Sequence, residues 1–117
     1  MYAYQRDQYM LLMSENPCEI FEYFGVDQMH GLCLSDCKKH LNNTQQAYIA
    51  GWSNVSPVDG SNFIFINLSR CTDDIYTTAL VMHEMMHLSF ELHKDEEELI
   101  SWAESEAIEI AHLIKLL

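Results

Sequence analysis

The segment His83-Glu84-Met85-Met86-His87 contains the residues whose types and spacing are best suited to chemistry in this chain. Residues four apart on an α-helix lie one above the other, so two imidazoles at this spacing can converge on one metal ion. Glu84 then projects beside the pair, where it can accept a proton from a water molecule that the metal activates. The spacing therefore predicts a zinc site in which His83 and His87 are ligands and Glu84 is the catalytic base.

The flanking sequence predicts a helix that holds both imidazoles on its apolar face. Thr72 is a candidate N-cap, and Asp73 and Asp74 place negative charge in the first turn, where it favours the helix dipole. Both histidines fall on a stripe of apolar residues that recur at helical spacing: Ile75, Tyr76, Ala79, Leu80, Met86 and Phe90. The alternative interpretation is a pair of core histidines whose polar atoms are satisfied by neighbouring carbonyl groups.

A catalytic zinc ion usually has three protein ligands, and three residues are candidates for the third. His93 stands ten residues after His83, the spacing of an HExxHxxGxxH pattern, but Phe90 occupies the position of its glycine. Glu106 and Glu104 belong to a later predicted helix, where each falls to one side of the expected buried stripe. The residues of that stripe are Leu99, Ala103, Ala107, Ile110, Ile114 and Leu117. The competing interpretation of both glutamates is a solvated acidic face.

Around Glu106 the chain resembles the gluzincin metallopeptidases, whose third zinc ligand is a glutamate on a following helix. Ser105-Glu106-Ala107-Ile108 resembles the start of their NExxSD pattern, and residues 106–111 resemble the EAxxxA helix of ImmA/IrrE-type metallopeptidases. The resemblance spans residues 61–111 and implies that Glu106 is the third ligand. Ile110 replaces the aspartate that supports the first histidine in NExxSD, so such support must come from elsewhere in the chain.

The length of 117 residues predicts a single domain over residues 1–117. We expect an α+β fold that is zincin-like and mostly helical, with a small antiparallel sheet beside the HExxH helix. Helices are predicted over residues 2–14, 18–24 and 27–41, and strands over 46–53 and 62–69, ahead of the two final helices. In the second strand, Ile64, Ile66 and Leu68 share one face, and Phe63, Phe65 and Asn67 share the other. By analogy with zincins, residues 62–69 are the edge strand that pairs with an extended peptide.

The net charge of −12 argues against a nucleic-acid partner, because such affinity depends on clustered Lys and Arg, and only six are present. An acidic surface is compatible with basic peptide partners. Neither a secretory signal nor an apolar run of membrane-spanning length is recognisable, so we expect a cytoplasmic protein without a membrane partner. Its four cysteines are then expected to be reduced thiols: Cys18, Cys33, Cys37 and Cys71.

A second group of metal-binding residue types, His30, Cys33, Cys37 and His40, forms an HxxCxxxCxxH run. On one continuous helix this run would span about 15 Å, which is too far for a single tetrahedral ion to contact all four residues. The spacing therefore favours a helix in which the cysteines act as small apolar side chains.

Together these patterns predict a zinc-dependent peptidase in which Glu84 is the general base and a peptide or protein is the substrate. One alternative is a non-catalytic interaction module that zinc stabilises. Another is a hydrolase that resembles the metzincins and uses His93 as its third ligand. Candidates for the group that stabilises the oxyanion are Tyr48, Tyr76, His93 and His112. The substrate and the oligomeric state cannot be read from these residues.

Overall fold

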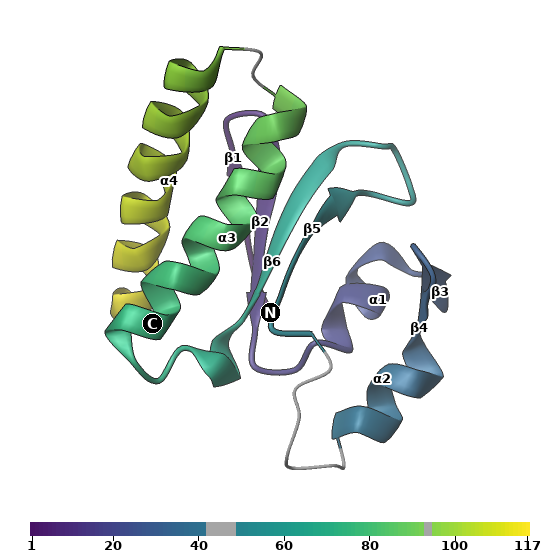
Figure 1. Cartoon of the computed structure of the whole chain (residues 1–117). Coiled ribbons are helices and arrows are strands. Elements are labelled where there is room, and N and C mark those ends of the chain that lie inside the picture. Colours follow the sequence, from purple (N-terminus) through teal and green to yellow (C-terminus); the bar gives the residue numbers. More distant parts are fainter. Residues whose placement is uncertain (42–48, 93–94) are drawn as a thin grey trace.

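The computed structural model describes residues 1–41, 49–92 and 95–117, which form a four-stranded sheet covered by helices on both faces (Figure 1). The strands lie in the order β1 (Tyr2–Arg6), β2 (Tyr9–Ser14), β6 (Asn62–Asn67) and β5 (Gly51–Val55). β2 and β6 are parallel, whereas the two outer pairs are antiparallel. The α+β class is as predicted, but the sheet is mixed rather than antiparallel.

Residues 2–14 form a β-hairpin, so the helix predicted there is wrong. A two-residue turn, Asp7-Gln8, joins β1 to β2 and sets Arg6 opposite Tyr9. β2 is buried along almost its whole length because strands flank it and helices cover both of its faces. A strand of this kind is a continuous apolar run, and hydrophobic periodicity does not distinguish it from a buried helical segment.

The next segment confirms one predicted helix and corrects another. α1 (Glu19–Phe24) forms as predicted, but the segment expected to be helical from residue 27 begins with a small hairpin, β3 (Gln28–Met29) and β4 (Leu32–Cys33). His30 and Gly31 lie between these strands and have φ values of 50° and 79°, which a tight hairpin turn requires and an α-helix does not allow. Helix α2 (Leu34–Leu41) therefore contains only the second half of the predicted helix.

Two long antiparallel helices, α3 (Asp74–Leu92) and α4 (Glu96–Leu116), lie side by side on one face of the sheet (Figure 1). Asp73, rather than the predicted Thr72, caps α3, because its Oδ1 accepts a hydrogen bond from the backbone N–H of Tyr76 at 2.8 Å. A short 3-10 helix, η1 (Leu68–Arg70), connects β6 to the loop before α3. Within the described residues, no helix is long and apolar enough to cross a membrane.

The predicted alternation of β6 is confirmed, since its two faces belong to two separate apolar clusters. Ile64 and Ile66 pack with α3 and α4, whereas Phe63 and Phe65 pack with α1 and with Cys37 of α2. β6 has a neighbouring strand on each side, so it is not the edge strand that was predicted. β1 and β5 are the outer strands of the described sheet, and β5 is the one that contacts α3. This arrangement sets the backbone of β5 beside the HExxH segment.

Candidate functional site

His83 and His87 lie together on the solvent-exposed side of α3. Their Nε2 atoms are 3.1 Å apart, and their ring centroids are 4.7 Å apart. Two imidazole nitrogens bound at about 2.0–2.1 Å to one tetrahedral zinc ion are separated by about 3.3 Å. The two side chains are therefore arranged as a pair that can share one metal ion.

The buried face of α3 differs from the predicted stripe. Ile75 and Phe90 are 83% and 70% exposed, and both histidines are exposed as well. The buried residues of α3 are Thr77, Leu80, Val81, Glu84, Met85, Leu88 and Ser89. α3 carries apolar residues on nearly every side, so helical spacing did not identify the face that the sheet covers.

Glu84 points inward from α3 against the backbone of β5 and is only 5% exposed. A Cβ atom at Gly51 of β5 would lie 2.9 Å from Cγ of Glu84 and 3.0 Å from Cδ1 of Leu80, so only glycine fits there without displacement. Burial raises the pKa of Glu84, and the neighbouring His83 opposes that rise. The Glu84 carboxylate has no hydrogen-bond partner among the residues that the structure describes, so it is free to accept a proton.

A cleft of about 540 Å3 runs between α3 and the outer strand β5 and brings these groups together. Glu91 lies one helical turn beyond His87 and adds a second carboxylate to its wall. The lining residues are Gly51, Trp52, Ser53, Asn54, Val55, Asn62, His83, Glu84, His87, Leu88 and Glu91. The cleft therefore combines a histidine pair, a buried carboxylate and the backbone of an edge strand.

Glu106, the predicted third ligand, lies in a different cluster on the β1–β2 side of α4. It is 8% exposed, it accepts a hydrogen bond from Nη2 of Arg6 at 2.7 Å, and Oε1 accepts another from the Tyr9 hydroxyl at 3.0 Å. Arg6 also forms an ion pair with Glu109. Glu106 is thus held in an ion pair away from the cleft, and the structure does not bring it to His83 and His87.

The other candidate ligands do not complete a metal site either. Glu104 is exposed and lines a separate groove between α3 and α4, and His93 lies outside the described residues. Within residues 1–41, 49–92 and 95–117, no group of three or more His, Cys, Asp or Glu side chains is placed to hold one metal ion. The described residues therefore bring together the two histidines predicted as ligands and the glutamate predicted as the base, but they place no third candidate ligand beside them.

The described residues that were predicted to stabilise the oxyanion do not line the cleft that contains the histidines. Tyr76 lies in the first turn of α3, and His112 lies on α4, so neither lines the cleft that contains Glu84. Tyr48 lies outside the described residues. No described candidate from the sequence is thus positioned to contact a carbonyl group near Glu84.

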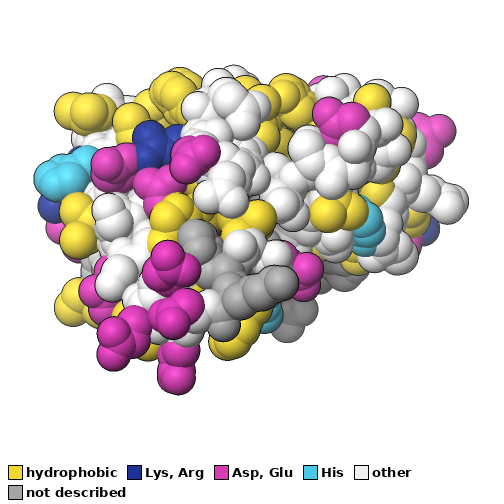
Figure 2. All heavy atoms as spheres, turned by 90° about the horizontal axis from the view of Figure 1, so that it is seen from above, with side chains coloured by type: hydrophobic (Ala, Val, Ile, Leu, Met, Phe, Trp, Pro, Cys, Tyr) yellow, Lys and Arg dark blue, Asp and Glu magenta, His cyan; other side chains and the backbone are white. Residues whose placement is uncertain are grey.

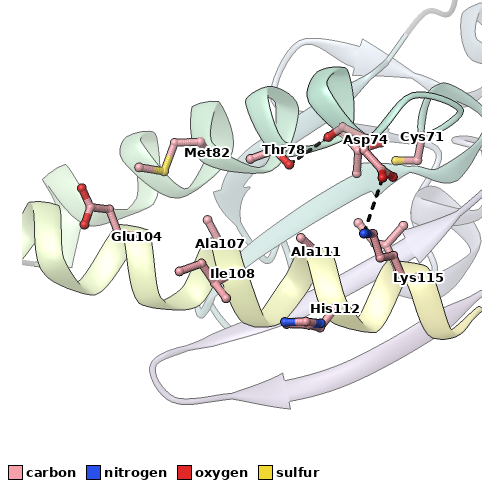
Figure 3. Close-up of a pocket in the computed structure, with 12 residues that line it drawn as sticks. Cys71, Asp74, Thr78, Met82, Glu104, Ala107, Ile108, Ala111, His112 and Lys115 are labelled. Atoms are coloured by element: carbon pink, nitrogen blue, oxygen red, sulfur yellow. Dashed lines mark hydrogen bonds and ion pairs between the residues drawn. The ribbon is translucent and has the colours of Figure 1, made fainter.

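The separate groove between α3 and α4 encloses about 570 Å3 and is lined mainly by apolar side chains, including Met82, Ala107 and Ile108 (Figure 3). An ion pair of 3.4 Å between Asp74 and Lys115 lies at one end. Its residues include neither of the cleft histidines nor Glu84, so we place the candidate site in the smaller cleft, where the reactive side chains meet.

The described side chains of the HxxCxxxCxxH run, those of His30, Cys33 and Cys37, do not form one metal-binding group, and the side chain of His40 lies outside the described part of the chain. His30 lies at the β3–β4 turn, where its Nε2 is 2.7 Å from the carbonyl oxygen of Val55. Cys37 instead contacts Cys18, which precedes α1. The prediction that this run is not a four-ligand metal site remains compatible with these positions, although the continuous helix assumed for it is wrong.

Two residues of the cleft were not identified from the sequence. Glu91 could have been found from its spacing, since it stands four residues after His87 and eight after His83 on the same helix. Gly51 could have been noted as a glycine within a predicted strand, a position that often marks a close approach to another group. That Gly51 contacts Glu84 depends on how α3 packs on the sheet.

Comparisons of the chain with protein-family models, with curated proteins and with solved structures gave no match.

Proposed function

We propose that the protein is a zinc-dependent peptidase of the HExxH type. The observation that carries this proposal is the arrangement of His83, Glu84 and His87 in one cleft. The two imidazole Nε2 atoms lie 3.1 Å apart, and the buried Glu84 carboxylate opens onto the same cleft. The resemblance of the HExxH segment and its neighbours to zincin peptidases supports the same activity.

The donor chemistry of the histidine pair fits zinc, which binds imidazole nitrogen well. When bound, zinc would supply an electrophile that polarises a peptide carbonyl and makes a water molecule a stronger nucleophile. α3 is continuous through Leu92, so Glu91 lies about 12 Å along the helix axis from His83 and cannot join both histidines on one ion. We therefore propose either His93 or Glu106 as the third ligand. To bind the metal, Glu106 would have to break its hydrogen bonds with Arg6 and Tyr9.

Glu84 is the general base of this proposal and acts twice in each turnover. It takes a proton from the attacking water and then donates that proton to the leaving amine of the substrate. The raised pKa of Glu84 suits both steps, because a carboxylate that binds a proton more tightly is a stronger base. The close contact with Gly51 restricts the Glu84 side chain to a position at the floor of the cleft.

The outer strand β5 is the proposed binding edge for an extended peptide. Its residues pair with β6 on one side only among the described strands. On the other side, the Val55 carbonyl oxygen already lies 2.7 Å from Nε2 of His30, and the Val55 N–H donates to Oδ1 of Asn54. The outward backbone groups of β5 that precede Val55 are therefore the ones that can bond to a substrate strand. Glu91 lies on the cleft wall, and exposed Glu96, Glu97 and Glu98 begin α4 near the same end of α3. Figure 2 shows acidic side chains gathered on the face seen from that end. We therefore propose a preference for peptides with basic side chains.

The arrangement gives less support to a module that zinc merely stabilises. Both histidines belong to one helix, so an ion held by them alone would not link separate elements of the fold. The two apolar clusters on the faces of the sheet are formed without these side chains. Removing zinc with a chelator should thus abolish cleavage while the protein stays folded, whereas a zinc-stabilised module would unfold.

The first test combines zinc content with cleavage of a fluorogenic peptide library. Native protein should bind zinc near one-to-one, His83→Ala should lose zinc, and Glu84→Gln should keep zinc and lose cleavage. His112→Ala is the matched control, because this exposed histidine lies on α4 outside the cleft and should change neither quantity. A native protein that takes up no zinc after reloading contradicts the proposal, as does a Glu84→Gln variant that cleaves at the native rate.

The third ligand is tested by comparing His93→Ala with Glu106→Gln in the same zinc measurement. Loss of zinc only in His93→Ala indicates a metzincin-like site, and loss only in Glu106→Gln indicates the gluzincin set. Circular dichroism of each variant distinguishes lost ligation from lost folding. Peptides with Lys or Arg near the scissile bond, compared with matched Glu or Asp peptides, then test the charge preference.

A further inference from the structure

Cys18 and Cys37 form a close pair of sulfur atoms far from each other in the sequence. Their Sγ atoms are 3.0 Å apart, and the Cys18 thiol donates a hydrogen bond to that of Cys37. This distance is about 1 Å longer than the 2.03–2.05 Å of a disulfide bond. Small rotations of the two side chains can close such a gap, so the pair is in position to be linked.

The surroundings of the pair are apolar and shielded from solvent. Cys18 is 2% exposed and Cys37 is fully buried, and both belong to the apolar cluster that α1 and α2 form on the second face of the sheet. Burial is the main cause that raises the pKa of the Cys37 thiol to about 12, and the contact with Cys18 adds to it. A bond formed here would be protected, because a reducing thiolate could reach it only after the layer opens.

We propose that Cys18 and Cys37 form an intramolecular disulfide that links the start of α1 to α2, while Cys33 and Cys71 remain thiols. All four cysteines are free thiols in the structure, which therefore represents the reduced form. The oxidant is a small-molecule disulfide such as oxidised glutathione. When the layer opens, one cysteine thiolate attacks this disulfide and releases one thiol, and the second cysteine then attacks the mixed disulfide and releases the other. The protein loses two electrons and two protons, and one external disulfide becomes two thiols.

The link joins two segments of the α1–α2 layer that no strand pairing connects among the described residues. It closes a loop from residue 18 to residue 37, which restricts the unfolded chain and stabilises the folded one. The layer lies on the face of the sheet opposite α3 and α4. Oxidation should therefore raise thermal stability without changing the histidine cleft, and the inference does not depend on the proposed peptidase activity.

The test is to treat folded full-length protein with oxidised glutathione, alkylate it under denaturing conditions and map its linked peptides by mass spectrometry without reduction. We expect two alkylated thiols after oxidation and four after reduction, with a cross-linked pair that contains Cys18 and Cys37. The oxidised protein should unfold roughly 10 °C higher than the reduced protein. Four alkylated thiols after oxidation, or a bond that involves Cys33 or Cys71, would overturn the proposal.

Cys33→Ser is the matched control, because Cys33 lies beside Cys37 in the sequence but is half-exposed in β4. This variant should keep the cross-link and the full difference in melting temperature between oxidised and reduced protein. Cys18→Ala and Cys37→Ala should each lose both. The peptide map of the unmodified chain decides the proposal even if an alanine variant fails to fold.

Discussion

The two buried glutamates of the helical layer, Glu84 on α3 and Glu106 on α4, differ in every partner that surrounds them. Glu106 accepts hydrogen bonds from Arg6 and Tyr9, whereas the Glu84 carboxylate has no hydrogen-bond partner within the described part of the chain. Glu84 instead lies against the glycine backbone of β5 and opens onto a cleft that contains two histidines. The two side chains have similar exposure, 5% and 8%, so burial alone does not separate them.

The difference shows that the partners of a buried charge indicate its role. A carboxylate that is paired and hydrogen-bonded contributes to the structure, and removing it leaves its buried partner unsatisfied. A buried carboxylate without a donor is held at a cost in stability and has a raised pKa, which is the state that a general base requires. We therefore expect Glu84 to matter for activity and Glu106 to matter for folding.

The largest expected effect is on catalysis by Glu84→Gln. This change removes the proposed base but keeps the shape of the side chain, so kcat should fall by about 10²–10⁴-fold. The free energy of unfolding should change by less than about 1 kcal/mol, since no hydrogen bond within the described residues is lost. Steady-state kinetics and urea unfolding measure the two quantities. A large loss of stability with unchanged kcat would reverse the comparison between the glutamates.

The next largest effect is the loss of stability in Glu106→Gln. Arg6 would lose a charged partner in a poorly solvated position, and the free energy of unfolding should fall by about 2 kcal/mol in a urea titration. Glu109→Gln is the matched control, because Glu109 also pairs with Arg6 but is more exposed. The Glu109→Gln substitution should lower the free energy of unfolding by no more than about 0.5 kcal/mol. Equal losses in both variants would show that the burial of Glu106 does not matter.

A smaller effect is expected from Gly51→Ala, which tests the contact that restricts Glu84. The added methyl group would press on the Cγ of Glu84 and on Leu80, and moving the proposed base by a fraction of an ångström should lower kcat about tenfold. Ser53→Ala, on the same strand and in the same cleft, is the control and should leave kcat nearly unchanged. Unchanged kcat in Gly51→Ala would mean that Glu84 needs no such restriction.

The smallest effect concerns how the free energy of unfolding depends on pH through the cluster of Arg6, Tyr9 and Glu106. Burial, followed by the nearby Glu106, raises the pKa of Tyr9 above its ordinary value of 10.0. A raised pKa means that the folded state favours the protonated hydroxyl. The contribution of Tyr9 to the free energy of unfolding is therefore complete below pH 10 and is lost as the pH rises above that value. Urea unfolding of the native protein at pH 9–11 should show this decline, and Tyr9→Phe should show a shallower one. An equal slope in both proteins would contradict the assignment.

The success of prediction differed among the elements for physical reasons. The existence of the helix around His83 and the alternation of β6 were predicted, because both depend on the spacing of apolar residues that are close together in the sequence. The strand β2 was mistaken for a helix, because a strand buried on both faces has no alternation to reveal it. The turn at His30 and Gly31 was missed within a pattern that otherwise suggested one helix.

The sequence by itself determined the HExxH spacing, and with it the placement of His83 and His87 on one side of a helix with Glu84 beside them. Helix geometry depends only on local hydrogen bonds, so this part needed no tertiary information. Only the tertiary structure decided that β5 is the edge strand, that Gly51 lies against Glu84 and that Glu106 pairs with Arg6. These contacts join residues far apart in the chain, and they depend on which face of each helix the sheet buries.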